Sequence, residues 1–191
     1  ILMNKTLLIF ISHASFFLSH RLELALQAKN KGYKVKIVLG EVDVNLKKLT
    51  NLNLDLIKIP LNRGSINPFK DIKSLYLIWK LFKKVKPDIV HLVTIKPYLY
   101  GGIIGRLTKV PCLVSAISGL GSLFIEKSLK NSFLRLIIYP FYSFAFNHSN
   151  QLVIVQNNED AKLLENWGVL KPEKVRLIKG SGINLKKFPQ N

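Results

Sequence analysis

Residues 7–11 read LLIFI, an uninterrupted apolar run that the polar Ser12 and His13 follow at once. A run of this kind predicts a β-strand that is buried on both faces. Residues 20–31 then carry an apolar stripe at helical spacing that ends at Gly32, a typical C-cap residue, and residues 33–39 form a second strand-like run. This strand–helix–strand order predicts two parallel strands joined by a crossover helix.

The same alternation continues to the end of the chain. Further strands are predicted over residues 54–59, 88–93, 112–117, 151–155 and 175–178, and further helices over 45–51, 67–86, 98–108, 132–147 and 159–167. Pro140 should kink or split the helix that contains it. About seven strands with helical crossovers predict an α/β fold, a parallel sheet with helices on both faces. Ligands of such folds bind outside the carboxyl ends of the strands, which directs attention to the loops there.

The composition indicates one globular domain with an unusual charge. The chain has 191 residues, of which 48% are hydrophobic and 21% charged, so a disordered or collagen-like chain is excluded. One cysteine, Cys112, excludes an internal disulfide framework and a cysteine-built zinc site. Lys and Arg number 29 against 11 Asp and Glu, a net charge of +18, and the excess runs through both halves of the chain. Such a domain should seek phosphates, on nucleic acid, anionic lipid or a phosphorylated substrate.

The first strand-end loop differs from that of a dinucleotide-binding protein. No glycine precedes Gly32, so the Gly-rich fingerprint that lets a pyrophosphate approach the backbone is missing, and no P-loop occurs in the chain. His13, Ser15 and His20 are instead suited to hydrogen-bond a hydroxylated or phosphorylated ligand. The alternative is that Ser19 only caps the following helix and both histidines are ordinary surface residues.

The fourth predicted strand, residues 88–93, leads into a second polar loop. His91 lies inside the apolar strand, which favours a hydrogen-bonded core histidine over a ligand-binding one. Thr94 and Lys96 stand at the strand end, and Lys96 is either a partner for a phosphate or a solvated lysine. Asp71, in the preceding helix, is expected to be an ordinary solvated acid.

A glycine-containing loop follows the fifth strand. Ser118, Gly119 and Gly121 there suggest unusual dihedral angles, or a backbone that approaches a ligand closely. A plain turn is the competing interpretation. The chain has no paired-carboxylate motif, no G-x-S-x-G and no H-E-x-x-H, so no catalytic residue and no metal site are predicted from motifs.

Five segments together carry a resemblance to a known family. They are residues 15–32 (SFFLSHRLELALQAKNKG), 88–102 (DIVHLVTIKPYLYGG), 114–124 (VSAISGLGSLF), 153–160 (VIVQNNED) and 180–188 (GSGINLKKF). In this order they resemble the N-terminal, acceptor-binding domain of family-4 retaining glycosyltransferases of the GT-B fold, of the type that builds bacterial polysaccharides or lipid-linked oligosaccharides. The resemblance implies a Rossmann-like domain over residues 1–179, and residues 180–191 would begin the connection to a second domain.

The resemblance also implies how the work is divided between the two domains. The C-terminal domain, absent from this chain, would bind the nucleotide-sugar donor, expected to be UDP-linked, and carry an E-x7-E pair of glutamates. This domain would hold no cofactor. His13, Ser15, His20, Thr94, Lys96, Ser118, Gly119 and Gly121 are the predicted acceptor-binding residues, and Asn157, Gly180, Ser181 and Gly182 would face the donor side.

Two positions depart from the family pattern. Residues 12–15 replace the Gly-Gly loop that many members have after the first strand. Val93 stands where many members have a second histidine, two residues after the one matched by His91, so no catalytic histidine is assigned at this loop. The resemblance therefore leaves the catalytic residues of this chain unassigned.

The helix predicted over residues 67–86 combines lysines and leucines in an unusual way. At 100° per residue, Leu75, Ile78, Trp79, Phe82 and Val85 form the predicted core stripe. The opposite side carries Lys70, Lys73, Leu77, Lys80, Leu81 and Lys84. Leucines between lysines suit a face that rests on an anionic bilayer, although two exposed leucines also occur on ordinary solvated faces. Residues 133–146 are a second candidate membrane surface, although their apolar character favours a buried helix there.

Three functions compete at this point. The first is the acceptor half of a sugar transferase that is cytoplasmic, peripheral to the inner face of the membrane, acts on a lipid-linked phosphate acceptor and is inactive alone. The second, motivated by the charge of +18, is a nucleic-acid-binding module, although no zinc-finger spacing, RNA-recognition signature or basic reading helix is visible. The third is a stand-alone sugar- or metabolite-binding domain. The spread of charge without nucleic-acid motifs favours the first, with no nucleic acid as a partner.

Overall fold

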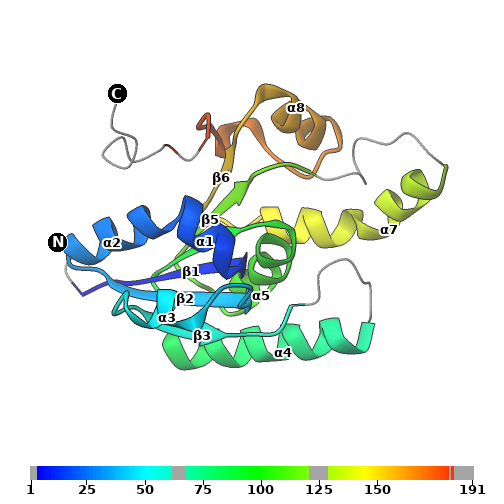
Figure 1. The fold of residues 1–191 in the computed structure, drawn as a ribbon. Helices are drawn as coiled ribbons and strands as arrows, with labels where there is room; N and C mark the ends of the chain where they lie inside the picture. Colours follow the sequence, from blue (N-terminus) through cyan, green and yellow to red (C-terminus); the bar gives the residue numbers. More distant parts are fainter. Residues whose placement is uncertain (1–3, 62–67, 121–128, 181, 183–191) are drawn as a thin grey trace.

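Seven parallel strands form the centre of the computed structural model, which describes residues 4–61, 68–120, 129–180 and 182 (Figure 1). The strands are β1 (Thr6–His13), β2 (Lys34–Glu41), β3 (Asp55–Lys58), β4 (Ile89–Val93), β5 (Cys112–Ile117), β6 (Gln151–Val155) and β7 (Val175–Leu177). Their order in the sheet is β3-β2-β1-β4-β5-β6-β7. The predicted seven-stranded parallel sheet is thus confirmed.

Helices cover both faces of this sheet. They are α1 (Ala14–His20), α2 (Leu22–Asn30), α3 (Leu46–Thr50), α4 (Pro68–Val85), the π-helical η1 (Pro97–Gly101), α5 (Gly102–Leu107), α7 (Leu129–Phe146), α8 (Asn158–Asn166) and the 3-10 turn η2 (Pro172–Lys174). One core lies between the sheet and α1, α2 and α3, and the other between the sheet and α4, η1, α5, α7 and α8.

Strand β1 shows why the sequence of residues 7–11 is apolar without interruption. Leu8 and Phe10 point into the core beneath α4 and α5, whereas Leu7, Ile9 and Ile11 point into the core beneath α1 and α2. Successive side chains of a strand alternate between the two faces, so a central strand covered on both sides needs an apolar residue at every position.

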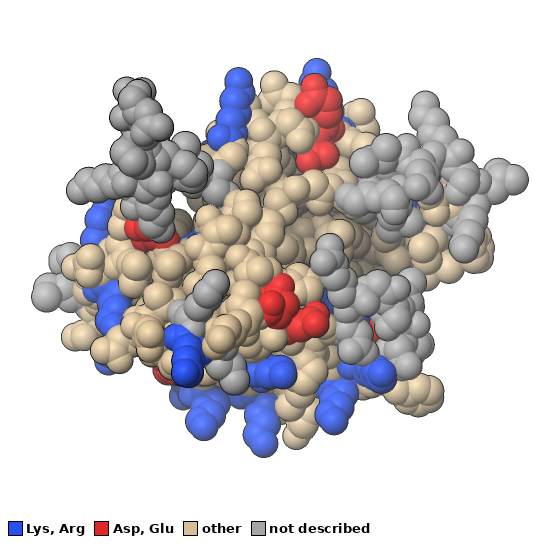
Figure 2. Space-filling model, viewed as in Figure 1, with Lys and Arg blue, Asp and Glu red and all other residues tan. Residues whose placement is uncertain are grey.

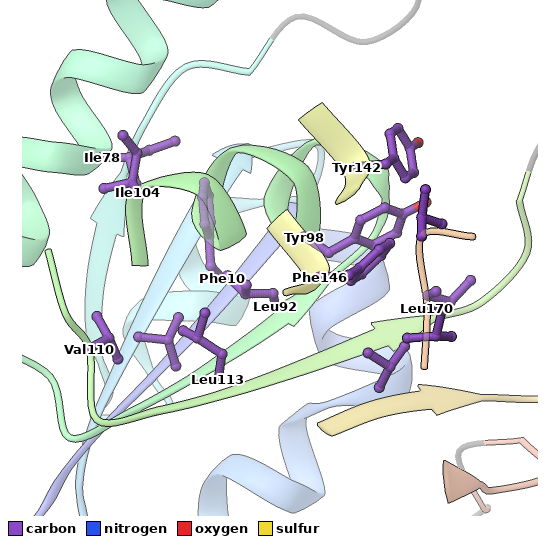
Figure 3. Close-up of a cluster of buried hydrophobic side chains, with 14 of the residues drawn as sticks. Phe10, Ile78, Leu92, Tyr98, Ile104, Val110, Leu113, Tyr142, Phe146 and Leu170 are labelled. Atoms are coloured by element: carbon purple, nitrogen blue, oxygen red, sulfur yellow. The ribbon is translucent and has the colours of Figure 1, made fainter. Parts of the chain in front are cut away.

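The larger core is centred on an aromatic cluster between η1 and α7. Tyr98 is fully buried, and its ring centroid lies 6.1 Å from that of Tyr142 and 5.6 Å from that of Phe146 (Figure 3). Beside this cluster, a Cβ atom at Gly102 would lie 3.0 Å from the Cβ atom of Ala145, so the glycine allows α5 and α7 to pack closely. This packing holds the start of η1 against the carboxyl end of the sheet.

The first crossover differs from the prediction. Helix α1 begins directly after β1, whereas the predicted helix began at His20, and α1 and α2 are separated only at Arg21. The backbone N–H of Ser15 donates a 2.9 Å hydrogen bond to Asp43, which comes from the loop after β2. This distant carboxylate caps α1, so local polarity alone wrongly predicted a loop there. Ser19 does not cap a helix; its hydroxyl donates to the Ser15 carbonyl within α1.

Pro140 does not split the helix that contains it. Helix α7 continues from Leu129 to Phe146 with the proline inside, so of the two predicted effects of Pro140, a kink or a split, the split is wrong. Among the described residues, we find no helix whose length and apolar character would let it cross a bilayer.

Candidate functional site

The order of the strands marks where a ligand site is expected. In the sheet, β2 and β3 lie on one side of β1, whereas β4 to β7 lie on the other. The order in which successive strands are added therefore reverses between β1 and β4. In open parallel sheets, ligands bind in the crevice outside the carboxyl ends of the strands at such a reversal. Ser12 and His13 end β1, and Thr94 follows β4, so these residues occupy that position.

Ser12 and Thr94 join the two strands at this point. Their hydroxyl oxygens lie 2.6 Å apart, and the backbone N–H of Ser12 donates to Thr94 Oγ1 over 3.2 Å. Thr94 has a φ of +74°, a conformation that is unfavourable for a β-branched residue. Backbone strain of this kind persists where surrounding contacts enforce it, and it gathers at functional sites. The structure therefore places Thr94, a predicted acceptor-binding residue, at a strained and well-anchored position.

Two carboxylates that sequence reasoning did not single out, those of Glu41 and Asp43, lie beside His13 and Ser15. His13 Nδ1 lies 3.5 Å from Glu41 Oε2 and 3.9 Å from Asp43 Oδ2. The Ser15 hydroxyl also hydrogen-bonds Asp43. Burial is the largest single effect on the pKa of the Asp43 carboxyl and acts to raise it. The hydrogen bonds from the Ser15 hydroxyl and backbone N–H act in the opposite sense, and the net result is a lowered pKa. Both polar groups of Ser15 are thus engaged within the protein, and this part of the edge is acidic.

His20 does not join the other predicted residues of this loop. It is the last residue of α1, whereas Ser15 lies in the first turn. Because the helix rises about 1.5 Å per residue, the two side chains lie near opposite ends of α1. Its ring stacks on Phe16 at a centroid distance of 4.1 Å, and its Nδ1 lies 2.6 Å from the hydroxyl of Ser19. The structure therefore separates His20 from the His13 and Ser15 end of α1.

Lys96 is neither a solvated lysine nor an isolated cation. Its Nζ donates to Asp71 Oδ1 over 2.7 Å, and the two side chains are 21% and 18% exposed. The ammonium also lies 5.6 Å from the centroid of the Tyr100 ring. Burial raises the pKa of Tyr100, and a hydrogen bond to Asp71 raises it further. Asp71, expected to be an ordinary solvated acid, is therefore part of a cluster that joins α4 to η1.

The remaining predicted residues lie on the later strands. Ser118 and Gly119 are exposed after β5, where Gly119 adopts a φ of +130°, and Gly121 lies outside the described residues. Asn157 caps α8 by accepting a 2.7 Å hydrogen bond from the Asp160 N–H. Gly180 and Gly182 are exposed with positive φ, whereas Ser181 lies outside the described residues.

His91 is a hydrogen-bonded core residue, as the sequence favoured. It is buried, and its Nε2 accepts a 3.2 Å hydrogen bond from Arg21 Nε. Burial lowers the pKa of His91 to about 4, and the charge of Arg21 also lowers it, while a hydrogen bond to the Val114 backbone acts in the opposite sense. Arg21 was not singled out from the sequence, because its partner lies 70 positions away and such a separation leaves no local signal.

The predicted lysine-leucine face of α4 needs a correction. Lys70, Lys73, Lys80 and Lys84 are exposed, but Leu77 and Leu81 are half-buried and pack against the larger core. The exposed apolar residues of this helix are Phe69 (86% exposed), Ile72 (63%), Tyr76 (57%) and Trp79 (42%). We call these four residues the α4 apolar row. Figure 2 shows basic side chains projecting along the same lower edge of the molecule, where Figure 1 places α4.

Helix α7 carries a second exposed apolar surface. Phe133, Leu136, Ile137 and Phe141 are each at least 48% exposed, whereas Tyr142, Ala145 and Phe146 at the end of the helix are buried. The favoured prediction of a buried helix is therefore wrong for this part of α7. The N-terminal ends of α4 and α7 lie on the right in Figure 1, on the side of the carboxyl ends of the strands.

Comparisons with known proteins agree with this architecture. Residues 6–157 match the family described as "Glycosyl transferase 4-like". The chain is 31% identical, over 94% of its length and 47% of the relative, to an N,N'-diacetylbacillosaminyl-diphospho-undecaprenol alpha-1,3-N-acetylgalactosaminyltransferase of Campylobacter jejuni. It is 33% identical, over 68% of its length and 32% of the relative, to a UDP-Gal:alpha-D-GlcNAc-diphosphoundecaprenol alpha-1,3-galactosyltransferase of Escherichia coli. The chain thus spans half or less of the length of these relatives.

A solved structure supports the fold class. The HepE protein of Anabaena, in complex with UDP and glucose, superposes with a TM-score of 0.65 and 14% identity over 98% of this chain and 47% of that chain. This likeness concerns the fold alone, and it confirms the predicted Rossmann-like half of a GT-B architecture.

Proposed function

The chain belongs to the glycosyl transferase 4-like family, and on this premise we propose that it is the acceptor-binding half of a glycosyltransferase that extends a lipid-linked diphosphate sugar. The observation that carries the proposal is the match over 94% of the chain to a transferase whose name specifies an undecaprenol-diphosphate acceptor. The acceptor site is the carboxyl edge of β1, β4 and β5, around Thr94, Lys96 and Ser118. The donor, a UDP-linked sugar, binds mainly to a second domain that follows residues 180–191.

Sugar transfer tests this proposal directly. The protein, produced together with the proposed donor-binding domain, is incubated with UDP-sugars and a short-chain polyprenyl-diphospho-sugar, and the products are identified by mass spectrometry. We expect one added hexose or N-acetylhexosamine, with retention of anomeric configuration. Residues 1–191 alone should show no transfer, because the groups that stabilise the departing nucleotide phosphates belong to the other domain. Turnover by this chain alone would contradict the division into two domains.

The proposal includes a peripheral position at the cytoplasmic face of the membrane. The α4 apolar row lies on the outer side of its helix, and the exposed Lys73, Lys80 and Lys83 lie beside it. Apolar side chains can enter the interfacial region of a bilayer while neighbouring lysines meet anionic headgroups. Each lysine near such a surface contributes about 1 kcal/mol. The apolar surface of α7 lies at the same edge of the sheet, so both helices would bring the acceptor site close to the lipid.

Vesicle binding tests this surface. Exchanging Phe69 and Ile72 for serine should weaken binding to anionic vesicles roughly tenfold or more, because two apolar side chains no longer enter the interface. Leu107→Ser is the matched control, since Leu107 is 59% exposed on α5, outside both apolar surfaces. Binding is measured by flotation at low and high salt and should weaken as salt rises. Equal binding to neutral and anionic vesicles, or no effect of the double substitution, would overturn the proposed membrane surface.

A further inference from the structure

The ion pair between Lys96 and Asp71 has a chemistry that differs from that of a phosphate site. The ammonium and the carboxylate are 2.7 Å apart, and both remain about one-fifth exposed, so a ligand at the carboxyl edge can reach them. Together they carry no net charge. An approaching diphosphate would be attracted by the ammonium and repelled at nearly the same distance by the carboxylate, so the two effects largely cancel.

A sugar hydroxyl has the opposite relation to this pair. A hydroxyl group is one donor and two acceptors, so it can donate to a carboxylate and accept from an ammonium at the same time. Hydrogen bonds to charged groups are stronger than those between neutral groups. A Lys–Asp pair can therefore bind two adjacent hydroxyls of a sugar ring, one donating to the carboxylate and the other accepting from the ammonium. A lysine without an acidic partner can bind only the second.

The surroundings hold the pair in place for such a role. Asp71 lies in the first turn of α4, where the neighbouring Ser74 hydroxyl donates to the Pro60 carbonyl over 2.7 Å and ties the helix to the end of β3. Tyr100, on η1, lies under the ammonium and contacts Asp71. The pair is thus supported by residues from α4 and η1. Its lysine lies two residues beyond Thr94, close to the reversal of the sheet.

We propose that the Lys96–Asp71 pair binds hydroxyl groups of the acceptor's sugar, and that it is a sugar-recognition subsite rather than the diphosphate-binding site. This inference rests on the proposed function, since it takes the lipid-linked sugar as the ligand. It assigns to Asp71 a role that neither the sequence nor the comparisons indicate, and it gives Tyr100 the role of positioning both charged groups. Transfer should therefore depend on Asp71 as much as on Lys96.

Two probes distinguish a sugar subsite from a diphosphate site. The first is a short-chain polyprenyl-diphospho-N-acetylhexosamine and the second is the same polyprenyl diphosphate without a sugar. Their dissociation constants and the KM and kcat of transfer are measured for the enzyme with both domains. Asp71→Asn and Lys96→Met should each weaken binding of the first probe, and raise its KM, about tenfold or more, because a charge-assisted hydrogen bond is lost. Binding of the second probe should change less than twofold.

The chain offers a matched control in a second Lys–Asp ion pair. Lys36 and Asp55 join β2 to β3 outside the candidate site, so Lys36→Met and Asp55→Asn should leave both probes unaffected. Lys96→Arg should recover part of the binding of the first probe, and the thermal midpoint of each variant reports whether it is folded. Tighter binding of the sugar-free probe by Asp71→Asn would overturn the inference, because it would mean that Lys96 binds the diphosphate. So would an unchanged KM for both variants.

The outcome also separates this inference from the proposed function. If the unmodified enzyme transfers no sugar to any polyprenyl-diphospho-sugar, the proposed function fails. If it transfers sugar but Asp71→Asn and Lys96→Met behave like the control pair, the function stands and the subsite is wrong.

Discussion

Lowering the pH from 7 to 4 is expected to reduce the free energy of unfolding by roughly 3 kcal/mol through His91 alone. In the folded protein the pKa of His91 is about 4, first because burial disfavours the imidazolium and second because the charge of Arg21 repels it. In the unfolded chain the histidine titrates near its ordinary value of about 6.5. Above that value both states are neutral, and the full stability is present.

The sign of the effect follows from which state binds the proton. Between about pH 6.5 and pH 4 the histidine is protonated in the unfolded chain but neutral in the folded protein. The free energy of unfolding therefore falls as the pH is lowered through this range. Each unit of difference between the two pKa values corresponds to about 1.4 kcal/mol, which gives the expected loss. Below the folded-state pKa both states bind the proton, and this residue causes no further loss.

Urea unfolding at several pH values measures this effect. His91→Gln is the informative variant, because glutamine can still accept a hydrogen bond from Arg21 but does not titrate. Its free energy of unfolding should fall less steeply between pH 6.5 and 4 than that of the unmodified protein, and the difference isolates His91 from the other histidines. Parallel curves for the two proteins would show that His91 binds its proton as readily in the folded as in the unfolded protein, against the buried neutral imidazole described above.

Most of the sheet could be predicted from the sequence because its signals are local. A strand that is buried on both faces needs consecutive apolar residues, so residues 7–11 identified β1 and the similar runs identified the strands beside it. The same reasoning failed at α1, whose N-terminus depends on Asp43, a residue that lies 28 positions after its partner Ser15. A cap supplied from another loop leaves no mark in the residues that it caps.

The α4 surface shows a different limit of sequence reasoning. The helical period was correct, but the side predicted to be buried was wrong in part. It included Trp79, which is exposed, and it left out Leu77 and Leu81, which pack against the core. Helix α4 packs against η1 and α5 as well as against the sheet, so its buried side includes both leucines. The exposed side then carries aromatic residues rather than leucines, which suits an interfacial surface at least as well.

The candidate site was predicted in position but not in its chemistry. Parallel α/β topology indicated the carboxyl ends of the strands, and Thr94 and Lys96 do lie there. The acidic partners could not be foreseen, because Asp71 lies 25 positions from Lys96 and belongs to a different helix. Contacts of this range depend on how the elements pack, and that packing converts an apparently free lysine into half of a neutral pair.

Replacing Tyr98 by alanine should have the largest effect on stability, a loss of about 3–5 kcal/mol in the free energy of unfolding. Its ring is fully buried between Tyr142 and Phe146, so truncation leaves a cavity that the surrounding rings cannot fill without moving. Aromatic pairs of this geometry also contribute beyond the area that they bury. The effect should extend to the candidate site, because Tyr98 anchors the segment of η1 that bears Tyr100 and follows Lys96.

Tyr98→Phe is the matched control, since it retains the ring and the packing and removes only the hydroxyl. Chemical unfolding should therefore place Tyr98→Phe within about 1–2 kcal/mol of the unmodified protein and Tyr98→Ala well below it. At a temperature where Tyr98→Ala is still folded, its KM for the sugar-bearing acceptor should rise, because the support of the Lys96–Asp71 pair is loosened. A loss as large in Tyr98→Phe as in Tyr98→Ala would mean that the hydroxyl, and not the packing of the ring, holds η1 against the sheet.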